Sequence, residues 1–137
     1  MPRAPFCWGC RVYWEDTDAG GIVYYANYLR FLERARSEWL RARGVSQRAL
    51  AQDPGIVFSV VGLEVRYRAP ARLDDLLVVS CEPDFTGGAS LNFRQQIWRE
   101  AAAGDALLVA TVRIACLDAA SLKPRRLPPV ITSMKED

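Results

Sequence analysis

The chain of 137 residues contains no histidine. This absence excludes the Ser-His-Asp triad, the Cys-His dyad and the histidine-bearing sites of the usual zinc hydrolases. Any chemistry in this protein must therefore depend on carboxylates, hydroxyls, thiols or backbone dipoles.

Long apolar runs are missing too. No segment approaches the ~18 consecutive apolar residues that a membrane-spanning helix needs. The N-terminal segment 1–7 is too polar and too proline-broken for the apolar region of a signal peptide. We therefore expect a cytoplasmic protein without a membrane span. The 18 Lys and Arg residues nearly balance the 16 Asp and Glu residues, and a net charge of +2 does not indicate a nucleic-acid partner.

Cysteine is scarce and scattered. The four cysteines are Cys7, Cys10, Cys81 and Cys116, and their spacing does not form a disulfide framework. Cys7 and Cys10 form a CxxC motif, which is found in redox centres and in halves of metal sites. Because the chain has neither histidine nor a second CxxC, it lacks the remaining ligands for a metal. We expect two small core residues there, with no metal and no cofactor.

The composition itself is typical of a globular domain. Hydrophobic residues make up 50% of the chain and charged residues 25%, which excludes a disordered protein. A domain usually takes about 100–200 residues, and no linker or internal repeat divides this sequence. We therefore expect a single domain over residues 1–137, with an irregular basic tail from about residue 121.

One long helix is predicted from residue 24 or 27 to residue 43. Its apolar residues recur at spacings of three and four and share one face; they are Tyr28, Phe31, Leu32, Ala35, Trp39 and Ala42. Gly44 follows as a natural helix terminator. Because such a stripe gains most of its stability from burial, the helix needs a partner surface.

The remaining periodic segments indicate strands, through alternating polarity or runs of β-favouring residues. The predicted strands cover residues 7–14, 61–68, 76–81, 91–97 and 107–117, with a turn over 86–89. This order indicates an α+β fold, in which an antiparallel sheet packs one face against the helix. The 107–117 strand is too apolar for an exposed edge, so we expect chains to associate through their sheet edges.

The residues with the clearest chemical potential lie between the first strand and the helix. Asp16, Asp18 and the pair Gly20-Gly21 come directly before the helix. The N–H groups at a helix N-terminus are unpaired donors with about half a unit of positive charge, so they polarise a carbonyl oxygen as an oxyanion hole does. A carboxylate beside them can attack that carbonyl or activate water towards it. These two parts are sufficient for acyl-group hydrolysis without histidine.

Other interpretations of this segment stay open. Aspartate and glycine are also the residues that any turn and helix N-cap would use, and spacing alone favours this structural interpretation. Asp16 and Asp18 match part of a magnesium site, although only Asp74-Asp75 offers a second carboxylate pair and no phosphate-binding loop is present. A paired-carboxylate glycosidase and a non-catalytic binding or scaffold module are further alternatives.

A longer pattern surrounds these aspartates. It consists of Tyr13-Trp14-Glu15-Asp16-Thr17-Asp18, Gly21-Ile22-Val23-Tyr24-Tyr25, Tyr28, Phe31 and Glu33-Arg34-Ala35-Arg36. The pattern resembles the signature of the hotdog-fold acyl-CoA thioesterases of the 4-hydroxybenzoyl-CoA thioesterase family, and within it the Tol–Pal-associated branch. Supporting similarity continues over residues 65–75 and 123–128, so the resemblance spans about 115 residues in the same order.

The resemblance implies roles for individual positions. The family's catalytic carboxylate corresponds to the second aspartate of the motif, Asp18. The backbone N–H of Tyr25, at the start of the helix, corresponds to the group that polarises the thioester carbonyl. The branch commonly has histidine where this chain has Tyr25, so the role implied for Tyr25 is that of its backbone. Asp16 is expected to brace the loop.

The resemblance also implies an acyl-CoA substrate and an assembly. We expect substrate contacts near the catalytic pair and in the basic tail, where positive charges suit the phosphates of CoA. These candidate contacts are Gly21, Val23, Tyr24, Asn27, Lys123, Arg125 and Arg126. The implied architecture is the hotdog fold, an antiparallel sheet wrapped around one long central helix. Family members form homodimers or homotetramers with active sites at the interface between sheets.

Overall fold

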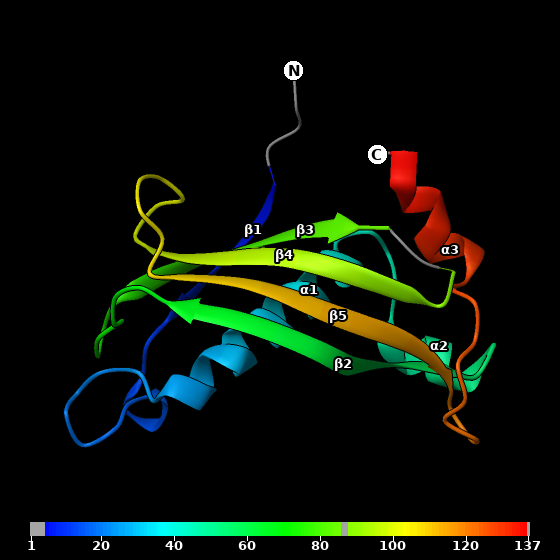
Figure 1. The fold of residues 1–137 in the computed structure, drawn as a ribbon, viewed down its shortest axis with the longest axis horizontal. Coiled ribbons are helices and arrows are strands. Elements are labelled where there is room, and N and C mark those ends of the chain that lie inside the picture. The colour runs from blue at the N-terminus through cyan, green and yellow to red at the C-terminus, as the bar shows by residue number, and fades with distance from the viewer. Residues whose placement is uncertain (1–4, 86–87, 137) are drawn as a thin grey trace.

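The computed structural model describes residues 5–85 and 88–136 and shows an antiparallel sheet with one long helix against it (Figure 1). The strands in spatial order are β1 (Phe6–Arg11), β3 (Leu76–Asp84), β4 (Ser90–Arg99), β5 (Leu108–Asp118) and β2 (Ile56–Tyr67). Every neighbouring pair is antiparallel. The predicted α+β class and the antiparallel sheet are confirmed.

Helix α1 (Tyr28–Arg41) packs its apolar stripe against the sheet. The buried residues are Tyr28, Phe31, Leu32, Ala35, Trp39 and Leu40. The stripe follows the prediction except at its end, where Ala42 is exposed and Leu40 is buried instead. A turn around Gly44, which has a φ of 78°, ends the helix because glycine adopts this conformation without a steric cost.

One buried side chain joins the helix to the sheet by hydrogen bonds. Gln95 in β4 is fully buried, and its amide nitrogen donates to the carbonyl oxygens of Leu32 in α1 and Ser80 in β3, at 3.0 and 3.3 Å. Its amide oxygen accepts a hydrogen bond from the half-buried Arg36 at 3.0 Å. A buried amide satisfied on both sides fixes its neighbours more specifically than apolar contact does.

Several element boundaries differ from the prediction. β1 ends at Arg11, because the N–H and the carbonyl of Val12 pair with Asp75 and Asp74. β2 begins at Ile56 and passes a bulge between Val60 and Gly62. Helix α2 (Gln47–Gln52) was not predicted. Two residues of the predicted turn over 86–89 lie outside the described residues.

The tail, residues 119–136, is not irregular throughout, contrary to the prediction. It contains the short helix α3 (Pro129–Thr132) and a final 3₁₀ turn (Ser133–Glu136). Leu127, Ile131 and Met134 of the tail are buried in the core. The tail therefore closes one end of the hydrophobic core.

The apolar strand β5 is not an exposed edge, in agreement with the sequence, because it pairs with β4 on one side and β2 on the other. The outer strands of the sheet are β1 and β2. β2 exposes four large apolar side chains over 46–57% of their surface, namely Val60, Val61, Leu63 and Tyr67. Long apolar edge strands of this kind favour pairing with another chain.

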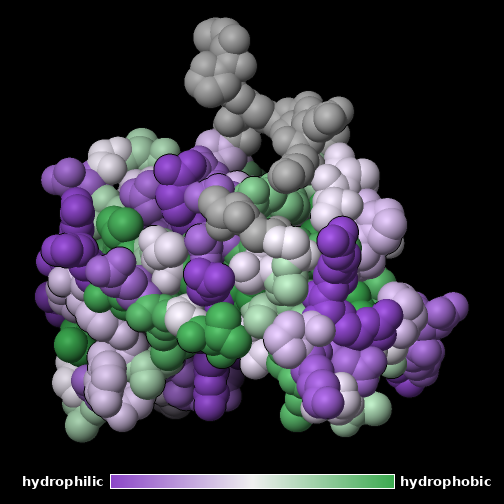
Figure 2. Space-filling model, turned by 45° about the vertical axis from the view of Figure 1, so that its right-hand side comes forward, coloured by the Kyte–Doolittle hydropathy of each residue, from purple (hydrophilic) through white to green (hydrophobic). Residues whose placement is uncertain are grey.

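Elsewhere the surface is mixed. On the face shown in Figure 2, hydrophobic side chains form small groups between hydrophilic ones. Among the described residues, no helix is both long and apolar enough to cross a membrane.

Candidate active site

The loop that carries Asp18 is a small hairpin, which we call the Asp18 loop (residues 15–24). Its arms are joined by hydrogen bonds from Tyr24 N to Asp16 O at 3.0 Å and from Asp18 N to Ile22 O at 2.9 Å. Gly21 stands in the turn with a φ of 77°, a conformation that strongly favours glycine. The hairpin fixes the backbone of Asp18 next to the start of α1.

The carboxylate of Asp18 is exposed and only partly used. Its Oδ1 accepts one hydrogen bond, from Gly20 N at 2.8 Å, and Asp18 makes no ion pair within the described part of the chain. An ionised carboxylate has about four lone-pair sites. The group is therefore free to attack a carbonyl or to accept a proton from water.

The backbone N–H of Tyr25 follows the hairpin at the first position of a 3₁₀ turn (Tyr25–Asn27) that leads into α1. This N–H has no acceptor among residues 5–85 and 88–136. The carbonyl oxygen of Tyr25 accepts a hydrogen bond from the hydroxyl of Tyr67 at 2.8 Å. The side chain of Tyr25 is 64% exposed. The sequence did not indicate the role of Tyr67, which holds the Tyr25 peptide in place from β2.

Asp16 and Asn27 form a buried pair beneath the loop. Asp16 is 6% exposed and Asn27 is 7% exposed. Asp16 accepts hydrogen bonds from Tyr13 N and from the Asn27 side chain, both at 2.8 Å. Asp16 thus joins the beginning of the loop to the beginning of the helix, in agreement with the bracing role expected for it. The Asn27 side chain is held inside by this bond.

Residues 71–73, in the segment that follows β2, are hydrogen-bonded to the Asp18 loop. Val23 N donates to Ala71 O at 2.8 Å, Leu73 N donates to Gly21 O at 3.1 Å, and Ile22 pairs with Arg72. The N–H of Ala71 donates to the buried hydroxyl of Tyr28. Burial is the largest cause that raises the pKa of the Tyr28 phenol, and the charge of Asp18 raises it further. Tyr28 therefore stays protonated and neutral beside the loop.

Four of the predicted site residues lie in the Asp18 loop or directly after it, namely Gly21, Val23, Tyr24 and Tyr25. Tyr24 is 49% exposed and its ring lies 4.9 Å from that of Tyr25, whereas Val23 is buried. The exposed aromatic rings and the unused polar groups leave this end of a single chain open to solvent.

The basic residues of the tail lie at the other end of the sheet. Leu117 pairs with Pro124, Asp118 pairs with Ile56, and Tyr67 near the Asp18 loop stands at the opposite end of β2. The length of β2 separates these ends by roughly 35 Å. Within one chain, Lys123, Arg125 and Arg126 are therefore not brought together with Asp18.

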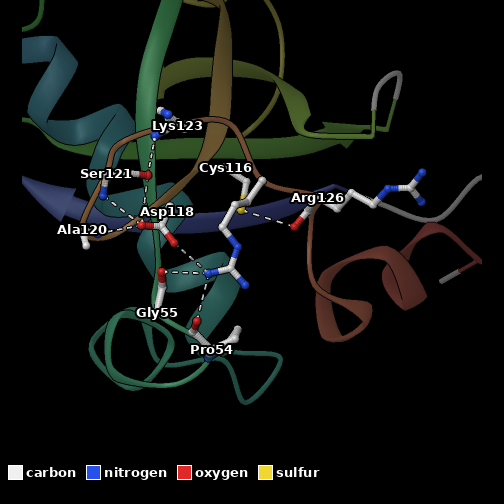
Figure 3. A network of polar contacts seen from close by, with 9 residues as sticks. Pro54, Gly55, Cys116, Asp118, Ala120, Ser121, Lys123 and Arg126 are labelled. Carbon is white, nitrogen blue, oxygen red and sulfur yellow. Dashed lines mark hydrogen bonds and ion pairs between the residues drawn. The ribbon is translucent and has the colours of Figure 1, made fainter.

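Arg125 is occupied by the protein itself. Its guanidinium donates to the carbonyls of Pro54 and Gly55 at 2.9 and 3.2 Å and to Asp118 at 3.3 Å (Figure 3). Hydrogen bonds from Ser121 are the largest cause that lowers the pKa of Asp118, and the charge of Arg125 adds to this. The guanidinium of Arg126 points away from this network, and Lys123 and Arg126 are exposed.

The CxxC motif lies in β1, with Cys7 exposed and Cys10 half-buried. The prediction of two core residues there is wrong, because alternate residues of this outer strand face solvent. Burial is the largest cause that raises the pKa of Cys10 to about 11. Such a thiol stays protonated at neutral pH and is a poor nucleophile and metal ligand. In the described residues, no group of three metal-binding side chains comes together.

A cavity of about 140 Å³ lies between α1, the sheet and α3. Its apolar walls include Phe58, Val60, Phe93 and Ile131, and Arg36 lines it as well. Burial lowers the pKa of Arg36. The cavity lies beside the β2 residues 58–60, towards the tail end of that strand.

Comparisons with known proteins agree on one family. Residues 20–114 match the model of the thioesterase superfamily. The chain is 46% identical to the acyl-CoA thioester hydrolase YbgC of Escherichia coli O6:H1, over 97% of both chains. It is 43% identical to the acyl-CoA thioesterase YbgC of Haemophilus influenzae, over 90% of this chain and 88% of the relative.

Solved structures show the same architecture. A probable thioesterase from Bartonella henselae superposes with a TM-score of 0.83 at 38% identity, covering 91% of this chain and 100% of that chain. A 1,4-dihydroxy-2-naphthoyl-CoA thioesterase from Synechocystis, 22% identical, shares the fold with a TM-score of 0.88 over 98% of this chain and 97% of its own. With its helix packed against an antiparallel sheet, the chain has the hotdog fold and belongs to the thioesterase superfamily.

Proposed function

We propose that the protein hydrolyses acyl-CoA thioesters to free CoA and a carboxylic acid, with Asp18 as the reacting carboxylate. In one route Asp18 attacks the thioester carbonyl, CoA leaves as thiolate, and water hydrolyses the resulting mixed anhydride to restore the carboxylate. In the other route Asp18 takes a proton from the water that attacks the carbonyl. In both routes the N–H of Tyr25 stabilises the negative charge on the carbonyl oxygen.

The observation that carries this proposal is the combination of an unused carboxylate and an unused N–H at the same loop. Asp18 keeps acceptor sites free, and Tyr25 N has no acceptor in the described chain. Both groups lie at the solvent-exposed loop, where a substrate carbonyl can replace the water that meets them in the free protein. The substrate class is supported by the names of the YbgC relatives, which are acyl-CoA thioester hydrolases.

A second copy of the chain would complete this open site. Antiparallel pairing of two β2 edges about a two-fold axis would place the Tyr67 end of one chain beside the Ile56 end of the other. The Asp18 loop of one copy would then face the cavity lined by Phe58 and Val60 of its partner. The same pairing would bring the partner's tail, with Lys123 and Arg126, towards the loop. We therefore propose a homodimer, or a homotetramer made from two such dimers.

The test is hydrolysis by the purified protein of a panel of aliphatic and aromatic acyl-CoAs. We expect turnover of at least one member of the panel, and loss of it in Asp18→Asn. A folded protein that binds CoA and hydrolyses no thioester would instead support the alternative of a non-catalytic binding or scaffold module. Single turnover in ¹⁸O-labelled water separates the two routes, because only the anhydride route can place label in Asp18.

A further inference from the structure

The backbone around the N–H of Tyr25 is held by hydrogen bonds on both sides of that N–H. On the preceding side, Tyr24 N donates to Asp16 O at 3.0 Å. Tyr24 O, which belongs to the same peptide group as Tyr25 N, accepts a hydrogen bond from Asn27 N at 2.8 Å. On the following side, Tyr25 O accepts a hydrogen bond from the hydroxyl of Tyr67 at 2.8 Å. Because peptide groups are planar, these bonds together fix the direction in which Tyr25 N–H points.

The three hydrogen bonds differ in where their partners come from. Asp16 belongs to the Asp18 loop and Asn27 to the turn before α1, so both are close neighbours of Tyr25 in the sequence. Tyr67 is the last residue of β2 and pairs with Leu108 of β5. Its hydroxyl therefore fixes the position of Tyr25 relative to the sheet, which the two local bonds do not do.

The ring of Tyr67 is itself held in place. It meets the ring of Tyr28 edge to face, with the centroids 5.6 Å apart and an angle of 61° between the planes, an arrangement that aromatic pairs favour. Tyr28 is buried, and its hydroxyl accepts a hydrogen bond from Ala71 N at 3.0 Å. Burial is the largest cause that raises the pKa of Tyr67, so its hydroxyl stays a proton donor at neutral pH.

We propose that Tyr67 is a positioning residue for thioester hydrolysis, whose hydroxyl holds Tyr25 so that its backbone N–H points at the carbonyl oxygen of the substrate. This assignment rests on the proposed function, and it adds a side chain of the sheet to the parts supplied by the Asp18 loop and the start of α1. Tyr67 acts through Tyr25 and does not touch the substrate. Alignment matters because an oxyanion donor stabilises the transition state only when its direction is fixed in advance.

The test uses the Tyr67→Phe variant, which keeps the ring beside Tyr28 and removes only the hydroxyl. With an acyl-CoA that the parent hydrolyses, we expect kcat to fall about tenfold. KM should stay within about twofold of the parental value, because the contacts of the bound substrate are retained. The loss should be smaller than in Asp18→Asn, because Tyr25 N stays near the carbonyl, and the melting temperature should be unchanged.

The matched control removes a second phenol hydroxyl at the same end of the molecule. Tyr13 precedes the Asp18 loop and is exposed, so Tyr13→Phe should leave both kcat and KM at the parental values. The proposal is overturned if Tyr67→Phe has the same kcat as Tyr13→Phe. It is also overturned if Tyr67→Phe raises KM and leaves kcat unchanged, because such a result would place the hydroxyl in substrate binding.

Infrared spectroscopy of a bound thioester distinguishes positioning from a merely structural role. Asp18→Asn slows turnover, so a thioester labelled with ¹³C at its carbonyl can be observed while bound. A hydrogen bond from Tyr25 N lowers the stretching frequency of this carbonyl, because it polarises the C=O bond. We expect Asp18→Asn with Tyr67→Phe to shift the frequency back towards that of the free thioester at unchanged affinity. An unchanged frequency overturns the proposal.

The two measurements separate this proposal from the proposed function. If the parent binds acyl-CoA and hydrolyses no thioester, the enzyme assignment fails. The frequency is then compared directly between the parent and Tyr67→Phe, where a shift supports the positioning role and its absence overturns it. If the parent hydrolyses thioesters and Tyr67→Phe keeps the parental kcat, the enzyme assignment stands and the positioning role fails.

Discussion

At the tail end of the sheet the guanidinium of Arg125 donates to three acceptors. At the loop end, within residues 5–85 and 88–136, the Asp18 side chain accepts one hydrogen bond and Tyr25 N donates none. The tail end buries Leu127, Ile131 and Met134, and the loop end exposes Tyr24 and Tyr25. The contrast separates an arginine whose hydrogen bonds support the fold from a loop whose exposed polar groups are accessible to a ligand.

The sharpest way to test this contrast is to remove the charge of Asp18. Asp18→Asn keeps the shape of the side chain and removes its basicity. We expect turnover of acyl-CoA to fall at least about 10²–10⁴-fold, with an unchanged melting temperature. Tyr25→Phe is the matched control and should cost much less, because the role of Tyr25 belongs to its backbone. A near-parental rate for folded Asp18→Asn would show that the catalytic assignment is wrong.

Charges on the open edge test whether the loop end is completed by a second copy. Val61→Lys with Leu63→Lys places two like charges on β2, where they would repel the same residues of a paired chain. We expect the parent to sediment at twice the chain mass of 15.3 kDa or more, and the variant to sediment as a monomer with reduced turnover. A parent that is monomeric at micromolar concentration contradicts the proposed assembly.

A substitution in the buried part of the tail should lower the stability of the protein rather than change its catalytic rate directly. Ile131 is completely buried, and truncation of a buried isoleucine typically costs about 2–5 kcal/mol. We expect Ile131→Ala to lower the free energy of unfolding in urea by this amount. A change of less than about 1 kcal/mol, as for exposed sites, would mean that the tail is not packed against the core.

Acid should weaken the hydrogen bonds and the ion pair that Asp118 makes with Ser121 and Arg125. The pKa of Asp118 is lower in the folded chain than its usual value, so its contribution is present above the unfolded pKa of about 3.9 and is lost as the pH falls through the folded pKa. We expect Asp118→Asn to have a lower melting temperature than the parent at pH 7. The difference should begin to shrink as the pH falls below about 4; a difference that does not shrink on acidification would contradict this linkage.

The smallest effect is expected at the CxxC motif. Cys7→Ser with Cys10→Ser should retain thioester hydrolysis, because the raised pKa of Cys10 keeps the thiol protonated. Metal content measured by emission spectrometry should be the same in both proteins. A stoichiometric zinc in the parent that is lost in the variant would show that the motif is a metal site.

The sequence predicted the features that depend on local periodicity. The stripe of α1 follows from spacings of three to four, and the cores of the five strands follow from alternating polarity or from runs of β-favouring residues. The loop was identified through its Asp and Gly pattern. Helix α2 was missed because six residues hold too little of a helical period. The beginning of β2 was missed because polar and apolar residues do not alternate over its first residues. The bulge between Val60 and Gly62 also shifts which residues of the strand face the core.

Spacing along the sequence does not predict which distant residues form hydrogen bonds with one another. Asp16 and Asn27 meet across eleven positions, and Tyr67 reaches Tyr25 across 42. The basic run from Lys123 to Arg126 has a uniform charge in the sequence, yet the fold engages Arg125 and leaves Arg126 exposed. Tertiary packing decides such partners, and neither periodicity nor charge specifies it.

The hydrogen bonds of Gln95 fix the position of α1 along its own axis relative to the sheet. Apolar stripes repeat with every turn, so packing alone would allow α1 to slide along the sheet by one turn, about 5.4 Å. The bond from Gln95 to Leu32 O has no equivalent one turn away that also serves Arg36. A glutamine in the middle of the sheet thus acts as a stop against sliding. It keeps the first N–H groups of the helix level with the carboxylate that must act beside them.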